Sequence, residues 1–178
     1  MSASWSHCVI RVRDADAMIS FYCDILDFRV ADKGPVVPNG PTIAFLSGSS
    51  SDHHQMGLIQ IRGEEDASSL DHNAFRVESV GEVKEMIKRL SEDERVATHS
   101  PVTHGNAISV YFADPEGNGV EVFCDSPWHV KQPQLKAWDP TKSDEEVLAF
   151  VEAEFKDEPE FQPMSEYRAT KAGEFGEN

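Results

Sequence analysis

The chain has 178 residues, 39% of them hydrophobic, so it is long enough to form one domain or two small modules with a shared core. A net charge of −16 argues against nucleic-acid or membrane partners, because phosphate backbones and anionic lipids are bound by clustered Lys and Arg. The N-terminus lacks the apolar stretch of a signal peptide and no other segment is apolar enough to cross a bilayer, so we expect a cytoplasmic protein.

A short pattern, His-x-x-x-Arg-Val, begins at His7 and again at His72. In both copies a strand-like segment leads into a helical one, with apolar residues at helical spacing over Ala15 to Leu26 and over Val80 to Leu90. The residue before each helix, an Asp or a Ser, is suited to cap its N-terminus. The pattern therefore predicts an internal structural repeat.

Three short strands are expected after each helix, because apolar runs alternate there with Gly, Pro, Asn and Ser. They lie at about 28–31, 42–46 and 55–61 in the first copy and at about 96–98, 107–112 and 119–124 in the second. Between the last two, Pro115 and Gly117 predict a hairpin turn. The sequence thus predicts an α+β fold of two tandem βαβββ modules, about 5–63 and 70–126, forming a curved mixed sheet around a cavity.

The last part of the chain differs from the two modules. We place a domain boundary near residue 130 and assign 131–178 to a C-terminal extension. An amphipathic pattern predicts one helix there, at about 143–156, and the segment from Glu158 onward is acidic and poor in apolar residues, so we expect a flexible tail. Three cysteines form no close pair and are expected to be reduced core residues: Cys8, Cys23 and Cys124.

Alternation along the strands places three potential metal ligands on one face. Successive strand residues point to opposite faces, and one face of each strand is apolar and expected to meet the helix. The other face then carries His7, His72 and Glu121, with Tyr111 of the neighbouring strand turned toward Glu121. A carboxylate in mid-strand costs free energy unless it is paired or metal-bound. Two imidazoles and one carboxylate form the facial triad that suits Fe(II), with Mn, Zn, Ni and Co as alternatives.

Structural interpretations of the same residues compete with this one. A histidine at the start of a strand is often a surface residue, and Glu121 could instead pair with Arg11 or Arg76. The agreement of three independent strand parities favours a metal-binding cavity. His99 and His129 are interpreted as solvent-exposed or loop residues and are not included in the site.

These segments resemble the vicinal oxygen chelate superfamily, which includes glyoxalases, bleomycin-resistance proteins and type I extradiol dioxygenases. The resemblance covers about residues 6–130 and is closest to the extradiol branch. It rests on His7, on the stretch from Phe21 to Phe28, on His72 to Val77 and on Asp114 to Glu121. Asp27 departs from the family pattern, which usually has glycine at this position.

The resemblance to extradiol enzymes implies a role for each candidate residue. The implied Fe(II) ligands are His7, His72 and Glu121; the implied acid/base residue is His54; the implied hydrogen-bond donors to the substrate are His104 and Tyr111. The implied substrates are a catechol-type aromatic diol and O₂. A homodimer is a further expectation at the level of the family.

Two other functions remain open from the sequence. A glyoxalase-like isomerase or lyase would take a fourth protein ligand from the last strand of the first module, where Gln60 shares a face with Met56 and Leu58. A non-enzymatic resistance protein that binds a small molecule would need a cleft but no metal. In each case we expect Met56, Leu58 and Phe123 to line an apolar pocket.

Overall fold

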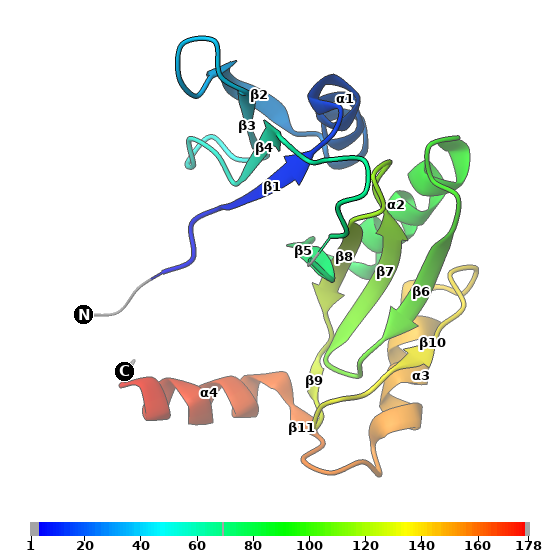
Figure 1. The fold of residues 1–178 in the computed structure, drawn as a ribbon. Coiled ribbons are helices and arrows are strands. Elements are labelled where there is room, and N and C mark those ends of the chain that lie inside the picture. The colour runs from blue at the N-terminus through cyan, green and yellow to red at the C-terminus, as the bar shows by residue number, and fades with distance from the viewer. Residues whose placement is uncertain (1–3, 69, 177–178) are drawn as a thin grey trace. The chain divides into compact units, whose positions relative to one another are not determined.

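The computed structural model describes residues 4–68 and 70–176, and Figure 1 shows their secondary structure. The chain divides into two compact units, which are described here one at a time. Unit 1 contains Met1–Asp71 and the turn Asp114–Asn118, and unit 2 contains His72–Ala113 and Gly119–Asn178.

Unit 1 is a four-stranded mixed sheet with one helix on one face. Its elements are β1 (Cys8–Val12), α1 (Ala15–Leu26), β2 (Arg29–Pro35), β3 (Thr42–Ser47) and β4 (Met56–Gln60). The strand order is β1-β4-β3-β2, with β1 and β4 parallel and the other neighbours antiparallel. Helix α1 begins where predicted, because the Asp14 side chain accepts hydrogen bonds from the backbone N–H groups of Asp16 and Ala17 in its first turn.

The core of unit 1 lies between α1 and the sheet. Met18, Phe21 and Tyr22 of the helix are fully buried, as are Leu46 of β3 and Leu58 of β4. Burying large apolar side chains of this kind contributes roughly 1.5–3 kcal/mol each to folding. The opposite face of the sheet is therefore the one left for polar and aromatic side chains.

Unit 2 repeats this arrangement. Its elements are β5 (His72–Arg76), α2 (Val80–Glu92), β6 (His99–Thr103), β7 (Ala107–Ala113), β8 (Gly119–Asp125), β9 (Trp128–His129), β10 (Lys136–Ala137), α3 (Asp144–Phe155), β11 (Gln162–Pro163) and α4 (Met164–Phe175). The main sheet has the order β10-β6-β7-β8-β5, and β5 runs parallel to β8 just as β1 runs parallel to β4. Helix α2 starts at the predicted cap, Ser79, and packs on β7 and β8. The α+β class and the βαβββ repeat are thus confirmed.

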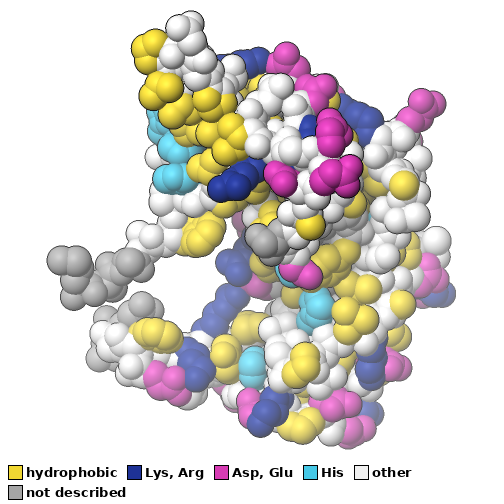
Figure 2. All heavy atoms as spheres, viewed as in Figure 1, with side chains coloured by type: hydrophobic (Ala, Val, Ile, Leu, Met, Phe, Trp, Pro, Cys, Tyr) yellow, Lys and Arg dark blue, Asp and Glu magenta, His cyan; other side chains and the backbone are white. Residues whose placement is uncertain are grey.

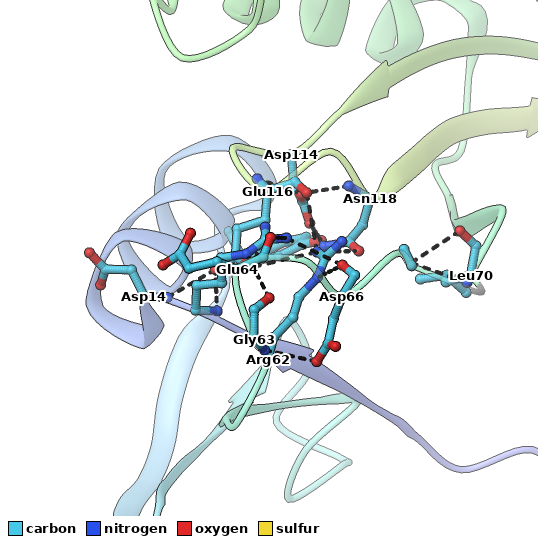
Figure 3. A network of polar contacts seen from close by, with 12 residues as sticks. Asp14, Arg62, Gly63, Glu64, Asp66, Leu70, Asp114, Glu116 and Asn118 are labelled. Carbon is cyan, nitrogen blue, oxygen red and sulfur yellow. Dashed lines mark hydrogen bonds and ion pairs between the residues drawn. The ribbon is translucent and has the colours of Figure 1, made fainter.

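The hairpin turn between β7 and β8 also forms as predicted. Gly117 has φ of +80°, which only glycine adopts readily, and the Asp114 N–H donates to the carbonyl of Asn118. This turn belongs to unit 1, where Glu116 accepts hydrogen bonds from the backbone N–H groups of Arg13 and Asp14 (Figure 3). Arg62, from the segment after β4, adds an ion pair to the same carboxylate.

The C-terminal segment differs from the prediction. The helix expected at 143–156 is α3, which starts with a capping box between Ser143 and Glu146. The tail was expected to contain no second helix, and this was wrong, because β11 and α4 form there (Figure 1). No side chain of α4 is buried, so the helix arises from good helix formers between Met164 and a glycine cap at Gly176, not from an apolar stripe. The last two residues of the expected tail lie outside the described residues.

Two smaller expectations are also corrected. The strand expected at 96–98 lies at His99–Thr103, beyond a turn in which Val96 N–H donates to the Asp93 carbonyl. His129 was interpreted as a solvent or loop residue but is only 7% exposed, because its ring stacks on Tyr167 of α4 at 3.6 Å. Among the residues that the structure describes, no helix has the length and apolar composition needed to span a membrane.

Candidate functional site

The centre of the candidate site in unit 2 is the pair His72 and Glu121. His72 opens β5 and Glu121 lies in the middle of β8, where the parallel register pairs Ala74 with Glu121 and so places both side chains on one face. The Nε2 atom of His72 is 3.4 Å from Oε2 of Glu121. Glu121 is only 6% exposed, so its carboxylate is held in a place where an unpaired charge would be costly.

A hydrogen bond from the neighbouring strand fixes the other oxygen of Glu121. The Ser109 hydroxyl donates to Oε1 at 2.6 Å, and Ser109 is itself fully buried in β7. The indole N–H of Trp138 donates to the Ser109 carbonyl at 3.0 Å. Arg76, one of the two arginines considered as a partner of Glu121, pairs with Asp125 instead. The carboxylate is therefore oriented by β7, with Oε2 directed to His72.

Two further predicted residues complete this cluster. Tyr111 lies directly opposite Glu121 in the β7–β8 pairing, and its ring meets that of His72 edge-on at 5.2 Å. The hydroxyl of Tyr111 is 3.1 Å from Nε2 of His104, whose Nδ1 is 2.6 Å from the carbonyl oxygen of Gln134. A carbonyl can only accept, so Nδ1 of His104 carries the hydrogen, and in the neutral ring Nε2 accepts from Tyr111. Unit 2 thus brings four of the six predicted site residues together.

The other two predicted residues, His7 and His54, lie together in unit 1. Their ring centroids are 4.2 Å apart, with His7 just before β1 and His54 just before β4. The Phe45 ring is 4.6 Å from that of His54. Desolvation lowers the pKa of the His54 imidazole below its ordinary value, and the nearby His7 and His53 rings lower it further. His54 is consequently a neutral imidazole over a wider range of pH than an isolated histidine.

Sequence reasoning missed two residues that contact His54 or its neighbour. His53 was given no role from the sequence, yet its Nδ1 lies 2.9 Å from Nδ1 of His54. Its Nε2 lies 2.8 Å from Oδ2 of Asp32 in β2. The adjacent histidines were a visible signal for the first contact. No pattern in the sequence indicated the contact of Asp32, because a bulge in the pairing of β2 with β3 decides on which face of the sheet Asp32 lies.

The internal repeat also bears on the predicted fourth ligand. In unit 2 the candidate ligand Glu121 is paired with Ala74, and the matching pair in unit 1 joins Val9 to Gly57. Glycine has no side chain to donate. Gln60 pairs with the buried Val12, so it lies on the helix side of the sheet, at the exposed end of β4.

The register of β1 with β4 also corrects the prediction that Met56 and Leu58 line a pocket. Met56 and Leu58 pair with Cys8 and Ile10 and are fully buried on the face that packs against α1, so they belong to the core. Phe123 shares the face of Glu121 and is half-buried, with the Arg76 guanidinium 5.2 Å above its ring. Figure 2 shows histidine side chains beside hydrophobic ones on the surface of unit 1.

The donor atoms of unit 2 fit a divalent metal in type and spacing. An imidazole nitrogen and a carboxylate oxygen 3.4 Å apart suit two ligands of one ion, each bonded at about 2.1 Å. The predicted third ligand, His7, belongs to unit 1. Across residues 4–68 and 70–176, no three His, Cys, Asp or Glu side chains are already gathered closely enough to hold a metal ion.

The fold and these residues define a βαβββ repeat protein with a nitrogen and oxygen donor set. The model of the Glyoxalase/Bleomycin resistance protein/Dioxygenase superfamily matches residues 4–122, and the chain belongs to this superfamily. The resemblance inferred from the sequence is therefore confirmed. The superfamily includes many enzymes, such as dioxygenases and lyases.

Curated relatives fall into more than one functional group. The chain is 29% identical over 127 residues to biphenyl-2,3-diol 1,2-dioxygenase 3 of Rhodococcus globerulus and 25% identical to dioxygenase 2 of the same organism. It spans 63% of the length of each of these enzymes, and the matches cover 68% of this chain. It is also 28% identical to a probable lactoylglutathione lyase of Synechocystis, covering 91% of that protein and 65% of this chain.

Solved structures support the fold. A glyoxalase/bleomycin resistance protein/dioxygenase domain from Frankia matches with a TM-score of 0.58 and 20% identity, over 70% of this chain and 93% of that one. The fosfomycin resistance protein FosX of Listeria monocytogenes, solved with Mn(II) and sulfate, matches with a TM-score of 0.56 and 18% identity, over 71% and 95%. At these identities the likeness establishes the fold and leaves the reaction open.

Proposed function

We propose that this chain is an extradiol ring-cleaving dioxygenase that acts on a catechol-type aromatic diol with O₂. The proposed Fe(II) ligands are His7, His72 and Glu121. The observation that carries the proposal is the arrangement in unit 2, where the 3.4 Å pair of His72 and Glu121 is flanked by the hydrogen-bonded pair of Tyr111 and His104. Similarity to two enzymes named for biphenyl-2,3-diol supports the same substrate class.

Bound Fe(II) would supply the redox chemistry by which O₂ reacts with an aromatic diol. The chain's own residues bind and orient the substrate. Because Nδ1 of His104 donates to the Gln134 carbonyl, a neutral His104 offers Nε2 as an acceptor, which changes the sequence-based expectation that it donates. A bound diol hydroxyl would replace Tyr111 as the donor to Nε2 of His104, and the Tyr111 hydroxyl would then donate to the diol instead. His54 is the proposed acid/base group.

The glyoxalase-like isomerase is the second candidate, favoured by the lactoylglutathione lyase relative that matches over 91% of its length. It predicts a fourth protein ligand from β4. The residue of β4 equivalent to Glu121 is Gly57, and Gln60 lies on the helix side, so the register supports three ligands over four. A resistance protein that only sequesters a small molecule would not need the buried carboxylate of Glu121.

The experiment is anaerobic reconstitution of the full chain with Fe(II), followed by aerobic assay against catechol and biphenyl-2,3-diol. We expect a ring-cleaved product, which is yellow, and its loss in Glu121→Gln. Glu145→Gln, which changes an exposed carboxylate of α3, is the matched control and should remain active. Absence of product with every diol would reject the dioxygenase. Tight Zn or Ni with four protein ligands would then favour the isomerase.

Localisation in the cytoplasm and assembly as a homodimer remain predictions. The first is tested by fractionation of cells that express the chain. The second is tested by light scattering of the purified protein, where a mass near twice that of one chain is expected.

A further inference from the structure

A β-bulge in unit 1 changes the face on which Asp32 lies. In the antiparallel pairing of β2 with β3, Val30 is opposite Leu46, and the register then shifts so that Asp32 is opposite Phe45. Without the extra residue, Val30 and Asp32 would share the helix side of the sheet. The bulge therefore moves the Asp32 carboxylate to the face that α1 does not cover.

On that face Asp32 belongs to a row that crosses the sheet. Phe45 pairs with Gly57 in β4, and Gly57 pairs with Val9 in β1. Phe45 contacts the rings of both His53 and His54, with centroid distances of 6.2 and 4.6 Å. The row thus brings the Asp32 carboxylate, the Phe45 ring and the proposed acid/base residue His54 to one side of the sheet of unit 1.

Two hydrogen bonds connect Asp32 to His54 through His53. Oδ2 of Asp32 is 2.8 Å from Nε2 of His53, and Nδ1 of His53 is 2.9 Å from Nδ1 of His54. A carboxylate only accepts, so Nε2 of His53 carries a hydrogen. In neutral His53 the other nitrogen must then accept, and the hydrogen between the rings belongs to Nδ1 of His54. The chain of donors leaves Nε2 of His54 with a lone pair.

We propose that Asp32 and His53 are positioning residues that hold His54 as its Nδ1–H tautomer, so that Nε2 is presented to a bound substrate. In this form an imidazole accepts a hydrogen bond or a proton from a substrate hydroxyl. The inference rests on the proposed function, in which His54 is the acid/base group. It extends that function to two residues that no sequence pattern assigned.

The orientation of His54 has additional support. Its ring contacts those of His7, at 4.2 Å, and Phe45, at 4.6 Å, and it meets the His53 ring edge-on with an interplanar angle of 88°. Asp32 and His53 are themselves largely exposed, with side-chain accessibilities of 69% and 60%. When Asp32 or His53 is removed, water can therefore take over part of the hydrogen bonding that orients His54. We expect these residues to contribute moderately to kcat.

The test reads the tautomer directly, without requiring turnover. Long-range ¹H–¹⁵N spectra of the full chain without iron, at about pH 8.5 where imidazoles are ordinarily neutral, distinguish Nδ1–H from Nε2–H. We expect His54 to be Nδ1–H in the wild type and to move toward Nε2–H in Asp32→Ala and in His53→Phe. Asp24→Ala, which removes an exposed carboxylate of α1, is the control and should leave the spectrum unchanged. Circular dichroism confirms that each variant is folded.

An Nε2–H tautomer of His54 in the wild type, or a tautomer unchanged by both substitutions, would overturn the proposal. In the iron-loaded enzyme Asp32→Ala should lower kcat roughly tenfold with little change in KM, less than the roughly 10² to 10⁴ ascribed to a general base itself. If no diol is cleaved but the tautomer shifts as expected, only the proposed reaction fails. If the wild type cleaves diols with His54 as Nε2–H, only the positioning role fails.

Discussion

The Ser109 hydroxyl donates a 2.6 Å hydrogen bond to Oε1 of Glu121, across the β7–β8 pairing. Glu121 is a proposed metal ligand, and groups that orient a metal ligand in this way typically contribute about 10- to 100-fold to metal affinity. We therefore expect Ser109→Ala to weaken metal binding by roughly that factor while the fold is retained. Competition against a chelator measures the affinity. Ser100→Ala changes an exposed serine of β6 and serves as the control; equal affinities in both variants would contradict the role of Ser109.

Tyr22 is fully buried and donates to Oδ2 of Asp114 at 2.9 Å. Burial, and then the negative charge of Asp114, raise the pKa of Tyr22 above its ordinary value. Tyr22→Phe should cost about 1–3 kcal/mol in the free energy of unfolding, because Asp114 loses a donor. Urea denaturation at neutral pH measures this loss.

The same tyrosine predicts a pH dependence. The folded state keeps the Tyr22 phenol protonated, whereas the unfolded chain releases the proton above about pH 10. Its stabilising contribution is therefore complete below that pH and decreases as the pH rises. The difference in unfolding free energy between wild type and Tyr22→Phe should shrink from pH 8 to 10.5, and a constant difference would be inconsistent with the raised pKa. Tyr167→Phe, in α4, is the control.

Glu116 and Arg62 form an ion pair in which each side chain is only 8% exposed. Removing one partner of a buried pair leaves an uncompensated charge and typically costs about 3–5 kcal/mol. Glu116→Ala should cost an amount in this range: Arg62 keeps contacts with the Glu116 carbonyl and the Asn118 side chain, but the backbone N–H groups of Arg13 and Asp14 lose their acceptor. Thermal and urea unfolding measure the loss. Glu64→Ala removes an exposed carboxylate nearby and should be close to neutral; a similar loss in both variants would contradict the importance of burial.

Cys124 lies in β8 and is 1% exposed. Burial raises the pKa of its thiol to about 11, and the neighbouring Asp125 carboxylate adds to the shift. Since the thiolate is the reactive form, Cys124 should resist Ellman's reagent at pH 8 in the folded protein and react after denaturation. Comparison with Cys124→Ala shows how much of the reaction with Ellman's reagent is due to Cys124. Rapid labelling of this residue in the native state would show that it is not buried as described.

Local patterns in the sequence were enough to predict the helices and most of the strands of both modules. Helix α1 runs over the predicted Ala15–Leu26, because its cap and its apolar spacing are both properties of adjacent residues. Strand parity correctly placed Glu121 opposite the apolar face of β8, since alternation follows from backbone geometry alone. Predictions failed where local signals were weak. The helix α4 has no apolar stripe, and the strand after α2 starts three residues later than expected.

The sequence by itself determined the repeat and the shared strand face of His72, Tyr111 and Glu121, because these depend on spacing along the chain. Only the tertiary structure decided which atoms meet. The choice of Gly57 over Gln60 as the counterpart of Glu121 depends on the register of parallel strands, which are far apart in sequence. The contact of Asp32 with His53 depends on a bulge, where one extra residue reverses the face of every residue that follows.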